Sequence, residues 1–443
     1  HLTLDTTHLT ASLRGYQSFA ARFALVQKKV IIGDEMGLGK TVEALAVMTH
    51  LRAQESHYSL VICPASVVTN WMREIQGKTD LQAHLLHGES DDRTLALQTW
   101  KQFGGVAVTT YGHLGWLLPE LGDFDRLGCV VLDEAHYIKN PEAQRSGRSA
   151  AIIAQTPYAI LLTGTPLENR VDDFRSLVGY IRPDLLLEAT DLRPRRFRRQ
   201  VAPAYLRRNQ EDVLTELPEL VQVEEWLPLS AEDEQTYRQA VFARNFQAMR
   251  QAAMVNGMNS EKLQRLREIV EEAEDNGRKV IVFSNFRRAL EAAATVMPGH
   301  VFGPLTGQVP ATKRQEMVDT FSAAPHGAVL LSQIIAGGVG LNIQAASVVV
   351  ICEPQLKPTT EWQAIGRAHR MGQLHSVQVH RLLSNVGVDR RIWEILGQKT
   401  SLFEEFAEIS EIAENTPEAI DISETELIRD VLDAERHRLF PTH

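Results

Sequence analysis

The sequence predicts an α/β protein with two similar units, each built on a mostly parallel sheet flanked by helices. Short apolar runs typical of buried strands alternate with segments whose apolar residues recur at helical spacing. Polar or glycine residues follow these strands, as expected where the carboxyl ends of parallel strands form one edge of a sheet. With 443 residues, the chain is long enough for two or three cores. We predict domains at 1–222, 223–400 and 401–443.

Composition is that of an ordinary globular protein, with 44% hydrophobic and 23% charged residues. No apolar run reaches about 18 residues, so we expect no membrane span, and the first residues lack the features of a signal peptide. The three cysteines, Cys63, Cys129 and Cys352, lie in expected strands without the paired spacing of a zinc site. We therefore expect buried, reduced thiols in a cytoplasmic protein.

The net charge of −10 is concentrated at the carboxyl end. Residues 401–443 hold 12 acidic and 3 basic residues, so the rest of the chain is at −1. A nearly neutral body can still carry a basic groove, and a nucleic-acid partner is therefore not excluded.

The segment 33–41 has the composition of a phosphate-binding loop. It follows an apolar strand and opens a segment with helical spacing, which is the context such a loop requires. Gly37 and Gly39 carry no side chains that block phosphate oxygens, so backbone N–H groups can surround the anion. Lys40 is expected to meet the outer phosphates and Thr41 a magnesium ion.

One position departs from the strict phosphate-loop pattern. Asp34 stands where that pattern has glycine, and a glycine is found one residue earlier, at Gly33. A chance glycine turn is the alternative interpretation.

A glutamine, Gln17, precedes this loop. Its amide can donate and accept one hydrogen bond each, which suits the edge of an adenine. An ordinary surface glutamine is the alternative.

Small hydroxyl residues follow two further strands. Ser66 comes after the strand at 60–63, and Thr109 and Thr110 end the strand at 106–108. Such residues can bond phosphate oxygens without reading bases, or they can simply cap helices.

Adjacent carboxylates, Asp133 and Glu134, end the apolar strand at 129–132. At a strand end, the first can hold magnesium through water and the second can orient and deprotonate a water molecule. Two neighbouring acids are costly to bury without a cation. A capping pair on an ordinary turn is the alternative. The next strand, at 159–162, runs into Thr163-Gly164-Thr165-Pro166.

The range 193–208 carries seven arginines and no acid. Such a run binds nucleic-acid phosphates, or it pairs with acidic surfaces such as the tail; we favour nucleic acid. The seven are Arg193, Arg195, Arg196, Arg198, Arg199, Arg207 and Arg208.

The second unit follows a helical region at about 231–274 and has strands at 280–283, 328–331 and 348–351. It has no lysine-bearing phosphate loop. Arg367 and Arg370 are three residues apart, so a helix projects both from one face. They suggest a site completed by the second unit, with an arginine that stabilises transition-state charge; surface salt bridges are the alternative.

The order of these motifs resembles the Swi/Snf-type ATPases of helicase superfamily two. The resemblance covers about residues 13–400. The motifs that carry it are Asp34-Glu35-Met36-Gly37-Leu38-Gly39-Lys40-Thr41, Asp133-Glu134-Ala135-His136, Leu162-Thr163-Gly164-Thr165-Pro166 and Arg367-Ala368-His369-Arg370-Met371-Gly372-Gln373.

The resemblance implies two RecA-like lobes that hydrolyse ATP, with Mg2+, in the cleft between them and grip DNA across both. Family members generally move along double-stranded DNA without separating its strands. The catalytic residues it implies are Lys40, Asp133, Glu134, Arg367 and Arg370, and the metal residues are Thr41 and Asp133. The implied ATP contacts are Gln17, Asp34, Gly37, Leu38, Gly39, Lys40, Thr41 and Gly338.

Two further groups of residues follow from the resemblance. Those that couple hydrolysis to movement are His136, Thr163, Thr165 and Gln363. Those on the DNA track are Ser66, Thr109, Thr110, Ser284 and Ser332, together with the basic residues Arg195, Arg196, Arg198 and Arg199.

The second lobe departs from the family pattern in two places. Residues 354–358 replace the usual tryptophan pair before asparagine-proline, and the spacing from Ser332 to Ala336 is one residue longer. A compact motor, nucleoid-associated if prokaryotic, fits better than a complete remodelling enzyme, with target choice left to protein partners or appended domains.

Two alternatives stay open beside a translocase that moves on double-stranded DNA. One is a strand-separating helicase or an RNA-dependent ATPase, and the other is an ATP-gated clamp or scaffold. The acidic tail is expected to pack partly as a helix, because apolar residues recur over 427–434. Alternatively, its acids occupy the DNA groove.

Overall fold

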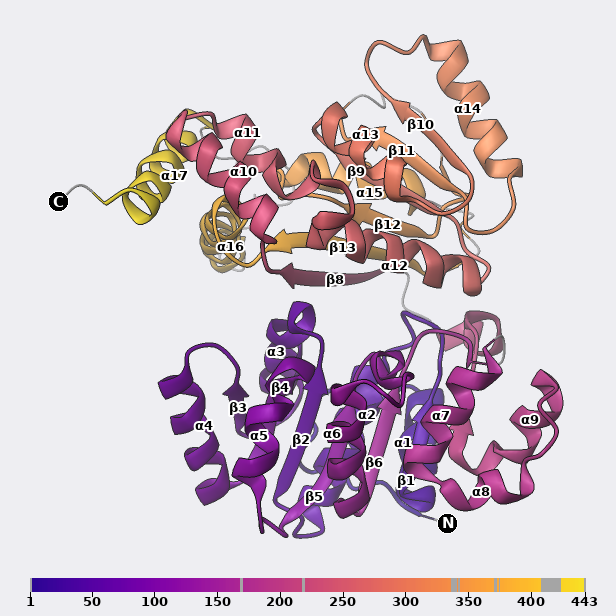
Figure 1. The fold of residues 1–443 in the computed structure, drawn as a ribbon. Coiled ribbons are helices and arrows are strands. Elements are labelled where there is room, and N and C mark those ends of the chain that lie inside the picture. Colours follow the sequence, from indigo (N-terminus) through magenta and orange to yellow (C-terminus); the bar gives the residue numbers. More distant parts are fainter. Residues whose placement is uncertain are drawn as a thin grey trace. The chain divides into compact units, whose positions relative to one another are not determined.

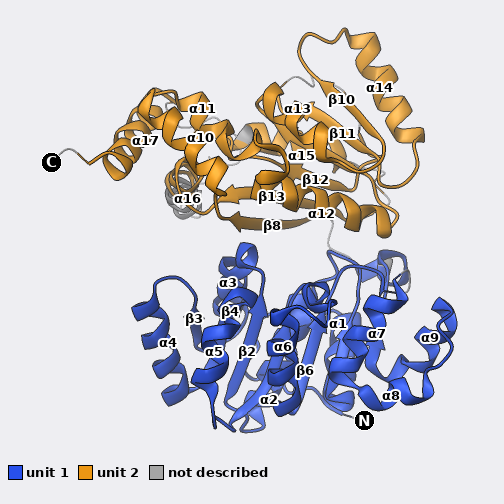
Figure 2. Cartoon of the chain, viewed as in Figure 1, with its two compact units in different colours: residues 1–217 blue, residues 218–443 orange. Residues whose placement is uncertain are grey.

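The chain forms two compact units, residues 1–217 and 218–443 (Figure 2). The computed structural model describes residues 2–167, 170–216, 220–335, 341, 343–369, 373, 375–407 and 424–441.

Unit 1 contains a seven-stranded sheet in the order β3-β4-β2-β5-β6-β1-β7 (Figure 1). Each hydrogen-bonded pair of these strands is parallel, so their carboxyl ends share one edge. The strands are β1 (Lys29–Ile32), β2 (Tyr58–Cys63), β3 (Ala83–Leu86), β4 (Gly105–Thr110), β5 (Leu127–Leu132), β6 (Tyr158–Leu162) and β7 (Tyr205–Leu206).

Helices cover both faces of this sheet. The first three helices pack on one face, with Val30 and Ile32 of β1, and the next four pack on the other, with Ile31. Successive residues of a strand therefore pack into the cores on opposite faces of the sheet. This explains why whole strands consist of apolar residues. The helices are α1 (Gly15–Gln27), α2 (Lys40–Ala53), α3 (Val68–Lys78), α4 (Ser90–Phe103), α5 (Leu114–Leu121), α6 (Gln144–Gln155) and α7 (Val171–Ile181), followed by the short α8 (Pro183–Glu188) and α9 (Pro194–Gln200).

Unit 2 contains a second parallel sheet, with six strands in the order β10-β11-β9-β12-β13-β8. The strands are β8 (Leu220–Leu227), β9 (Val280–Ser284), β10 (Val301–Leu305), β11 (Val329–Gln333), β12 (Val348–Ile351) and β13 (Val377–Ser384).

The helices of unit 2 serve three cores. One face of the sheet packs on α12 and α13, and the other on α14 and α15. A third cluster joins α10, α11, α16 and α17, with Leu427 and Val431 of α17 buried. The helices are α10 (Ala231–Phe242), α11 (Phe246–Gln251), α12 (Glu261–Asp275), α13 (Arg287–Val296), α14 (Ala311–Ala323), α15 (Pro358–Ala368), α16 (Val388–Ala407) and α17 (Glu424–Leu439).

The predicted fold class, two α/β units on parallel sheets, is confirmed. The boundary lies after residue 217, whereas the predicted boundary after residue 222 falls inside β8, which pairs with β13 of the second sheet. Within the acidic tail, α17 packs against α10, α11 and α16 of unit 2, and residues 408–423 lie outside the described residues.

The three cysteines are buried and carry free thiols. None of the described helices has the length and apolar content needed to cross a membrane.

Candidate functional site

The predicted motifs of unit 1 meet at the carboxyl edge of its sheet. Strands β5, β6 and β1 are neighbours, with Leu132 opposite Leu161 and Ile32 opposite Leu162. The phosphate loop therefore leaves the sheet beside Thr163, and Asp133 leaves it one strand further along.

The phosphate loop has the backbone that its glycines predict. Gly37 and Gly39 adopt φ of 90° and 84°, in the left-handed region that favours glycine. A Cβ atom on Gly39 would lie 2.5 Å from Gln17 Nε2, so a side chain here would displace the Gln17 amide. Helix α2 begins at Lys40, whose ammonium donates to the Asp34 carbonyl at 2.8 Å.

Gln17 holds this loop from α1. Its amide nitrogen donates to the Leu38 carbonyl at 3.1 Å, and its amide oxygen accepts from the Arg14 N–H at 3.0 Å. The Tyr16 hydroxyl donates to the same Leu38 carbonyl at 2.7 Å. Gln17 thus lies beside the predicted nucleotide, and its contact with adenine stays a prediction.

The side chain of Asp34, a predicted ATP contact, is engaged beneath the loop, and its contact with ATP stays a prediction. This carboxylate is fully buried and bonds the backbone N–H of Arg208 at 2.8 Å and its guanidinium. It therefore supports the loop from beneath.

Asp133 is fixed by two aromatic side chains. The Trp71 indole N–H donates to its carboxylate at 2.8 Å, and the Tyr111 hydroxyl donates to its backbone carbonyl at 2.7 Å. Burial and the neighbouring Glu134 carboxylate raise the pKa of Asp133 to about 6, while Trp71 and the positive charge of Lys40 act in the opposite direction.

Glu134 sits on a left-handed turn, with φ of 49° and ψ of 52°. Its carboxylate lies 3.3 Å from Nδ1 of His136. The turn after β5 thus places the Glu134 carboxylate beside a basic side chain, which is consistent with orienting a water molecule.

The donor set fits Mg2+. Among the described residues, no group of three or more histidine, cysteine or acidic side chains could hold a metal alone. Mg2+ usually keeps several waters and takes one or two carboxylates plus substrate phosphates. Asp133, with its raised pKa beside Glu134, and the half-exposed Thr41 at the start of α2 provide such a partial set.

Thr163 and Thr165 form one local unit next to the loop. The Thr163 backbone N–H donates to the Ile32 carbonyl at 3.1 Å, and its hydroxyl accepts from the Thr165 N–H at 3.2 Å. This bridge joins the end of β6 to the strand that carries the phosphate loop, a position consistent with the predicted coupling role.

Three residues predicted to lie on the DNA track are fully buried in the described structure, and their contact with DNA stays a prediction: Thr109, Ser284 and Ser332. The Thr109 hydroxyl donates to the Leu86 carbonyl of β3, and the Ser284 hydroxyl to the Glu353 carboxylate at 2.9 Å. The Ser332 hydroxyl donates to the Gln333 carbonyl at 3.1 Å. These side chains stabilise strand ends.

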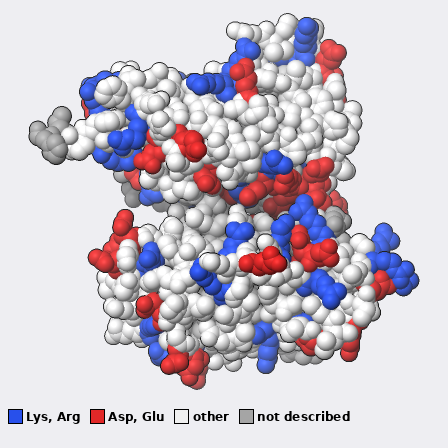
Figure 3. Space-filling model, in the orientation of Figure 1, with Lys and Arg blue, Asp and Glu red and all other residues white. Residues whose placement is uncertain are grey.

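Four predicted DNA-binding arginines lie on α9. Phe197 is buried and anchors this short helix against Phe174, with ring centroids 5.2 Å apart, while the arginines around it are exposed. Figure 3 shows positive side chains gathered at the edge of unit 1 where Figure 1 places α9. Arg196 is partly neutralised by Asp191, at 3.2 Å. The exposed set is Arg195, Arg196, Arg198 and Arg199.

In unit 2, Arg367 ends α15 and is half-buried. Its guanidinium lies 5.7 Å from the Phe283 ring centroid and donates to the Ile334 carbonyl at 3.4 Å. Gln363, one turn earlier, is exposed. Gly338 and Arg370 lie outside the described residues.

The sequence analysis did not identify three residues that hold site residues in place: Trp71, Tyr111 and Arg208. For Trp71 and Tyr111, the only indication in the sequence was their position near the polar ends of strands. Arg208 was counted only as part of the basic run.

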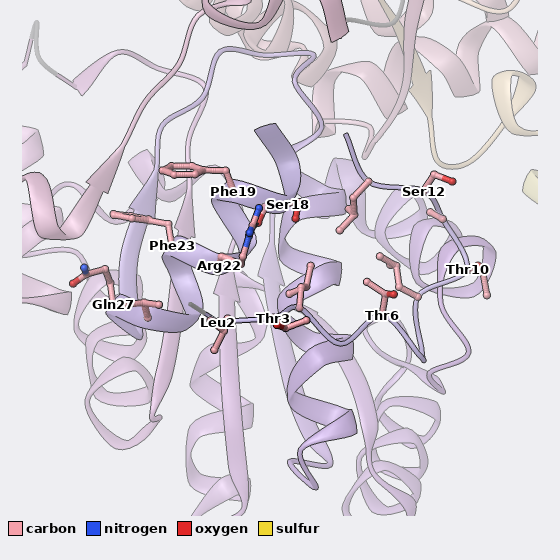
Figure 4. A pocket seen from close by; sticks show the side chains of 15 residues that line it. Leu2, Thr3, Thr6, Thr10, Ser12, Ser18, Phe19, Arg22, Phe23 and Gln27 are labelled. Carbon is pink, nitrogen blue, oxygen red and sulfur yellow. The ribbon is translucent and has the colours of Figure 1, made fainter. Parts of the chain in front are cut away.

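A separate hollow of about 1080 Å³ lies between the N-terminal segment and α1 (Figure 4). Phe19, Arg22 and Phe23 line it from one side of α1. Tyr16 and Gln17, which hold the phosphate loop, are buried and are not among the residues that line the hollow. The hollow is therefore distinct from the site at the sheet edge.

Comparison with known proteins agrees with this architecture. A family model for the SNF2-related domain matches residues 16–276, and one for the helicase conserved C-terminal domain matches residues 261–372. The Sulfolobus solfataricus SWI2/SNF2 ATPase core, solved in complex with dsDNA, superposes with a TM-score of 0.74 and 25% identity, covering 97% of this chain and 99% of that one.

Curated relatives include an uncharacterized ATP-dependent helicase of Mycoplasma genitalium, 26% identical over 91% of this chain and 43% of the relative. The ISWI chromatin-remodeling complex ATPase ISW1 of Saccharomyces cerevisiae is 26% identical over 89% of this chain and 40% of the relative. The chain thus spans less than half the length of these relatives. Since the SNF2-related model covers more than half of the chain, this protein belongs to the SNF2 family of ATPases in helicase superfamily two.

Proposed function

We propose that this chain is the core of an ATP-driven motor that moves along double-stranded DNA without separating its strands. The observation that carries the proposal is that the phosphate loop with Lys40 and the Asp133–Glu134 pair follow β1 and β5, the two strands that flank β6, at one edge of the same sheet. The likeness to a SWI2/SNF2 core solved with dsDNA supports the choice of partner.

Each group of the site then has a chemical task. Lys40 and the loop N–H groups bind the phosphates of ATP. Glu134, with His136 beside its carboxylate, orients and deprotonates the attacking water. Thr41 and Asp133 hold Mg2+, which when bound neutralises charge on the phosphates. Arg367 and Arg370 of unit 2 stabilise the charge of the transition state when the units close.

The DNA path is proposed to run over the α9 arginines and the carboxyl edge of the unit 1 sheet. The α9 arginines are exposed, and guanidinium groups bind phosphates in bidentate fashion. Ser66 and Thr110 stand at strand ends on that edge, although both are mostly buried. We place the motor in the cytoplasm, and target choice in partners or in segments that its longer relatives carry.

The first experiment measures ATP hydrolysis with and without double-stranded DNA. DNA should raise the rate, and Glu134→Gln should lower it by about 100-fold or more, the usual range for loss of a general base. The matched control is Glu142→Gln, an exposed residue on the same connection, which should keep the parent rate. A parent enzyme without DNA stimulation contradicts the proposal.

A second experiment separates translocation from its rivals. A motor of this kind should displace a triplex-forming strand from duplex DNA while leaving a forked duplex paired. Unwinding of the fork, or stimulation by RNA alone, indicates a helicase or an RNA-dependent ATPase. A single turnover without further cycling indicates a clamp.

A further inference from the structure

Arg208 occupies the centre of a buried ion cluster beneath the phosphate loop. Its guanidinium donates to both carboxylate oxygens of Asp34, with Nε at 3.2 and 3.1 Å, and to Glu43 Oε1 at 3.1 Å. It also donates to the Tyr16 carbonyl of α1. One side chain thus joins the loop, α2 and α1.

Two buried carboxyl groups share Arg208 as their guanidinium partner. Asp34 and Glu43 are both fully buried, and among the described residues Arg208 is the guanidinium bonded to both of them. Arg208 bonds Asp34 through its backbone N–H as well as its guanidinium, so it is the nearest counter-ion of this buried side chain.

Lys40 is the next cation near Asp34. It donates to the Asp34 carbonyl, and its charge reaches the Glu43 carboxyl of the same cluster. Without Arg208, the buried Asp34 carboxylate would lack its counter-ion. The Lys40 ammonium would then pair with Asp34 and be less available to a phosphate.

Arg208 also lies in a short segment, residues 205–210, that runs along the loop; we call it the strap. Gly33 N–H donates to the Leu206 carbonyl at 2.7 Å, and Glu35 N–H to the Arg208 carbonyl at 2.9 Å. Gln210 N–H donates to the Glu35 carboxylate at 2.8 Å. The strap continues through residues 210–216, the last described part of unit 1 before β8.

We propose that Arg208 is a positioning residue for ATP binding: it neutralises Asp34, keeps Lys40 free for the phosphates and ties the loop to the strap. This inference rests on the proposed ATPase function. It removes Arg208 from the DNA-binding part of the basic run and assigns it to the nucleotide site.

The test compares Arg208→Gln with the parent in ATP titrations and steady-state hydrolysis. We expect the Kd and KM for ATP to rise about 10- to 100-fold, as is usual when a supporting partner of a site is lost. Arg175→Gln, an exposed arginine on α7, is the matched control and should leave both constants unchanged. Thermal unfolding of each variant reports folding separately.

The double variant Asp34→Asn with Arg208→Gln distinguishes positioning from a merely structural role. It removes the carboxylate that would capture Lys40, so ATP affinity should return to within a few-fold of the parent. The double variant tests the proposed positioning role even if Arg208→Gln alone does not fold. The inference is overturned if Arg208→Gln folds and binds ATP like the parent, or if the double variant folds and binds ATP 10-fold or more weakly. A parent without ATPase activity contradicts the proposed function instead.

Discussion

A buried carboxylate, Glu435, helps to hold helix α17 against α10. Removing this carboxylate by mutation tests how stable the contact between the two helices is. Glu435 is 1% exposed and accepts the Tyr237 hydroxyl at 2.9 Å. It also pairs with Arg391 and, at 2.6 Å, with Arg438, whose side chains are 33% and 40% exposed. Burial acts to raise the pKa of Glu435, but the hydrogen bonds from Arg438 and Arg391 outweigh it, so the pKa is lowered.

Glu435→Ala should destabilise the α10–α17 contact by about 2–4 kcal/mol. The Tyr237 hydroxyl, left unpaired at 3% exposure, accounts for about 1–3 kcal/mol. The two partly exposed arginines can rehydrate, so their lost ion pairs add only about 1 kcal/mol. Because the folded pKa of Glu435 is lowered, its contribution is present above pH about 4.3 and is lost as pH falls through the folded pKa.

Hydrogen exchange followed by mass spectrometry measures this contact, because it resolves the peptides of α10 and α17 from those of unit 1. The matched control is Glu426→Ala, an exposed acid on the same helix, which should change exchange little. Unchanged protection of α17 in Glu435→Ala would refute the reasoning. Release of α17 with a rise in DNA-independent hydrolysis would instead support a restraining role for the tail.

Two further predictions concern the phosphate site. Gly39→Ala should weaken ATP binding at least about tenfold in a fluorescent-nucleotide titration, because the position has a positive φ and a Cβ would clash with Gln17; Gly77→Ala, in open space, should not. Since protonation removes the ligand charge of Asp133, Mg2+-dependent ATP binding should weaken as pH falls below about 6. Trp71→Phe removes a hydrogen bond that lowers this pKa and should move the midpoint to higher pH; an unmoved midpoint would contradict the assignment.

The strands that could be predicted from sequence were those in which every residue is apolar. The long strand β8 was not predicted, because it contains the charged residue Glu225. In the fold this carboxylate is buried and paired with Arg265 at 2.7 Å and with His380 of β13 at 3.2 Å. Local pattern cannot reveal such a strand, since the partners that make its charge tolerable lie 40 and 155 residues away.

In the candidate site, too, features with a local sequence pattern were predicted, whereas features that depend on distant residues were not. The phosphate loop and the acidic pair are local patterns, and their residues were found by type and spacing. The buried contacts of Asp34 depend on Arg208, 174 residues later, and could not be found from a local pattern. Thr109 was predicted on the DNA track because small hydroxyl residues at strand ends can bond phosphate oxygens. In the fold its hydroxyl donates to the Leu86 carbonyl of β3, and the residue is buried.

The direction of the strands also shows where an optical probe can be attached. Because the strands of each sheet run the same way, turns at their amino-terminal ends are remote from the catalytic edge. Glu55, before β2, and His300, before β10, are exposed in such turns. Because the three native thiols are buried, cysteines introduced at these two positions would react selectively with a donor and an acceptor dye. Energy transfer between the dyes would then report changes in the distance between the two units during each turnover.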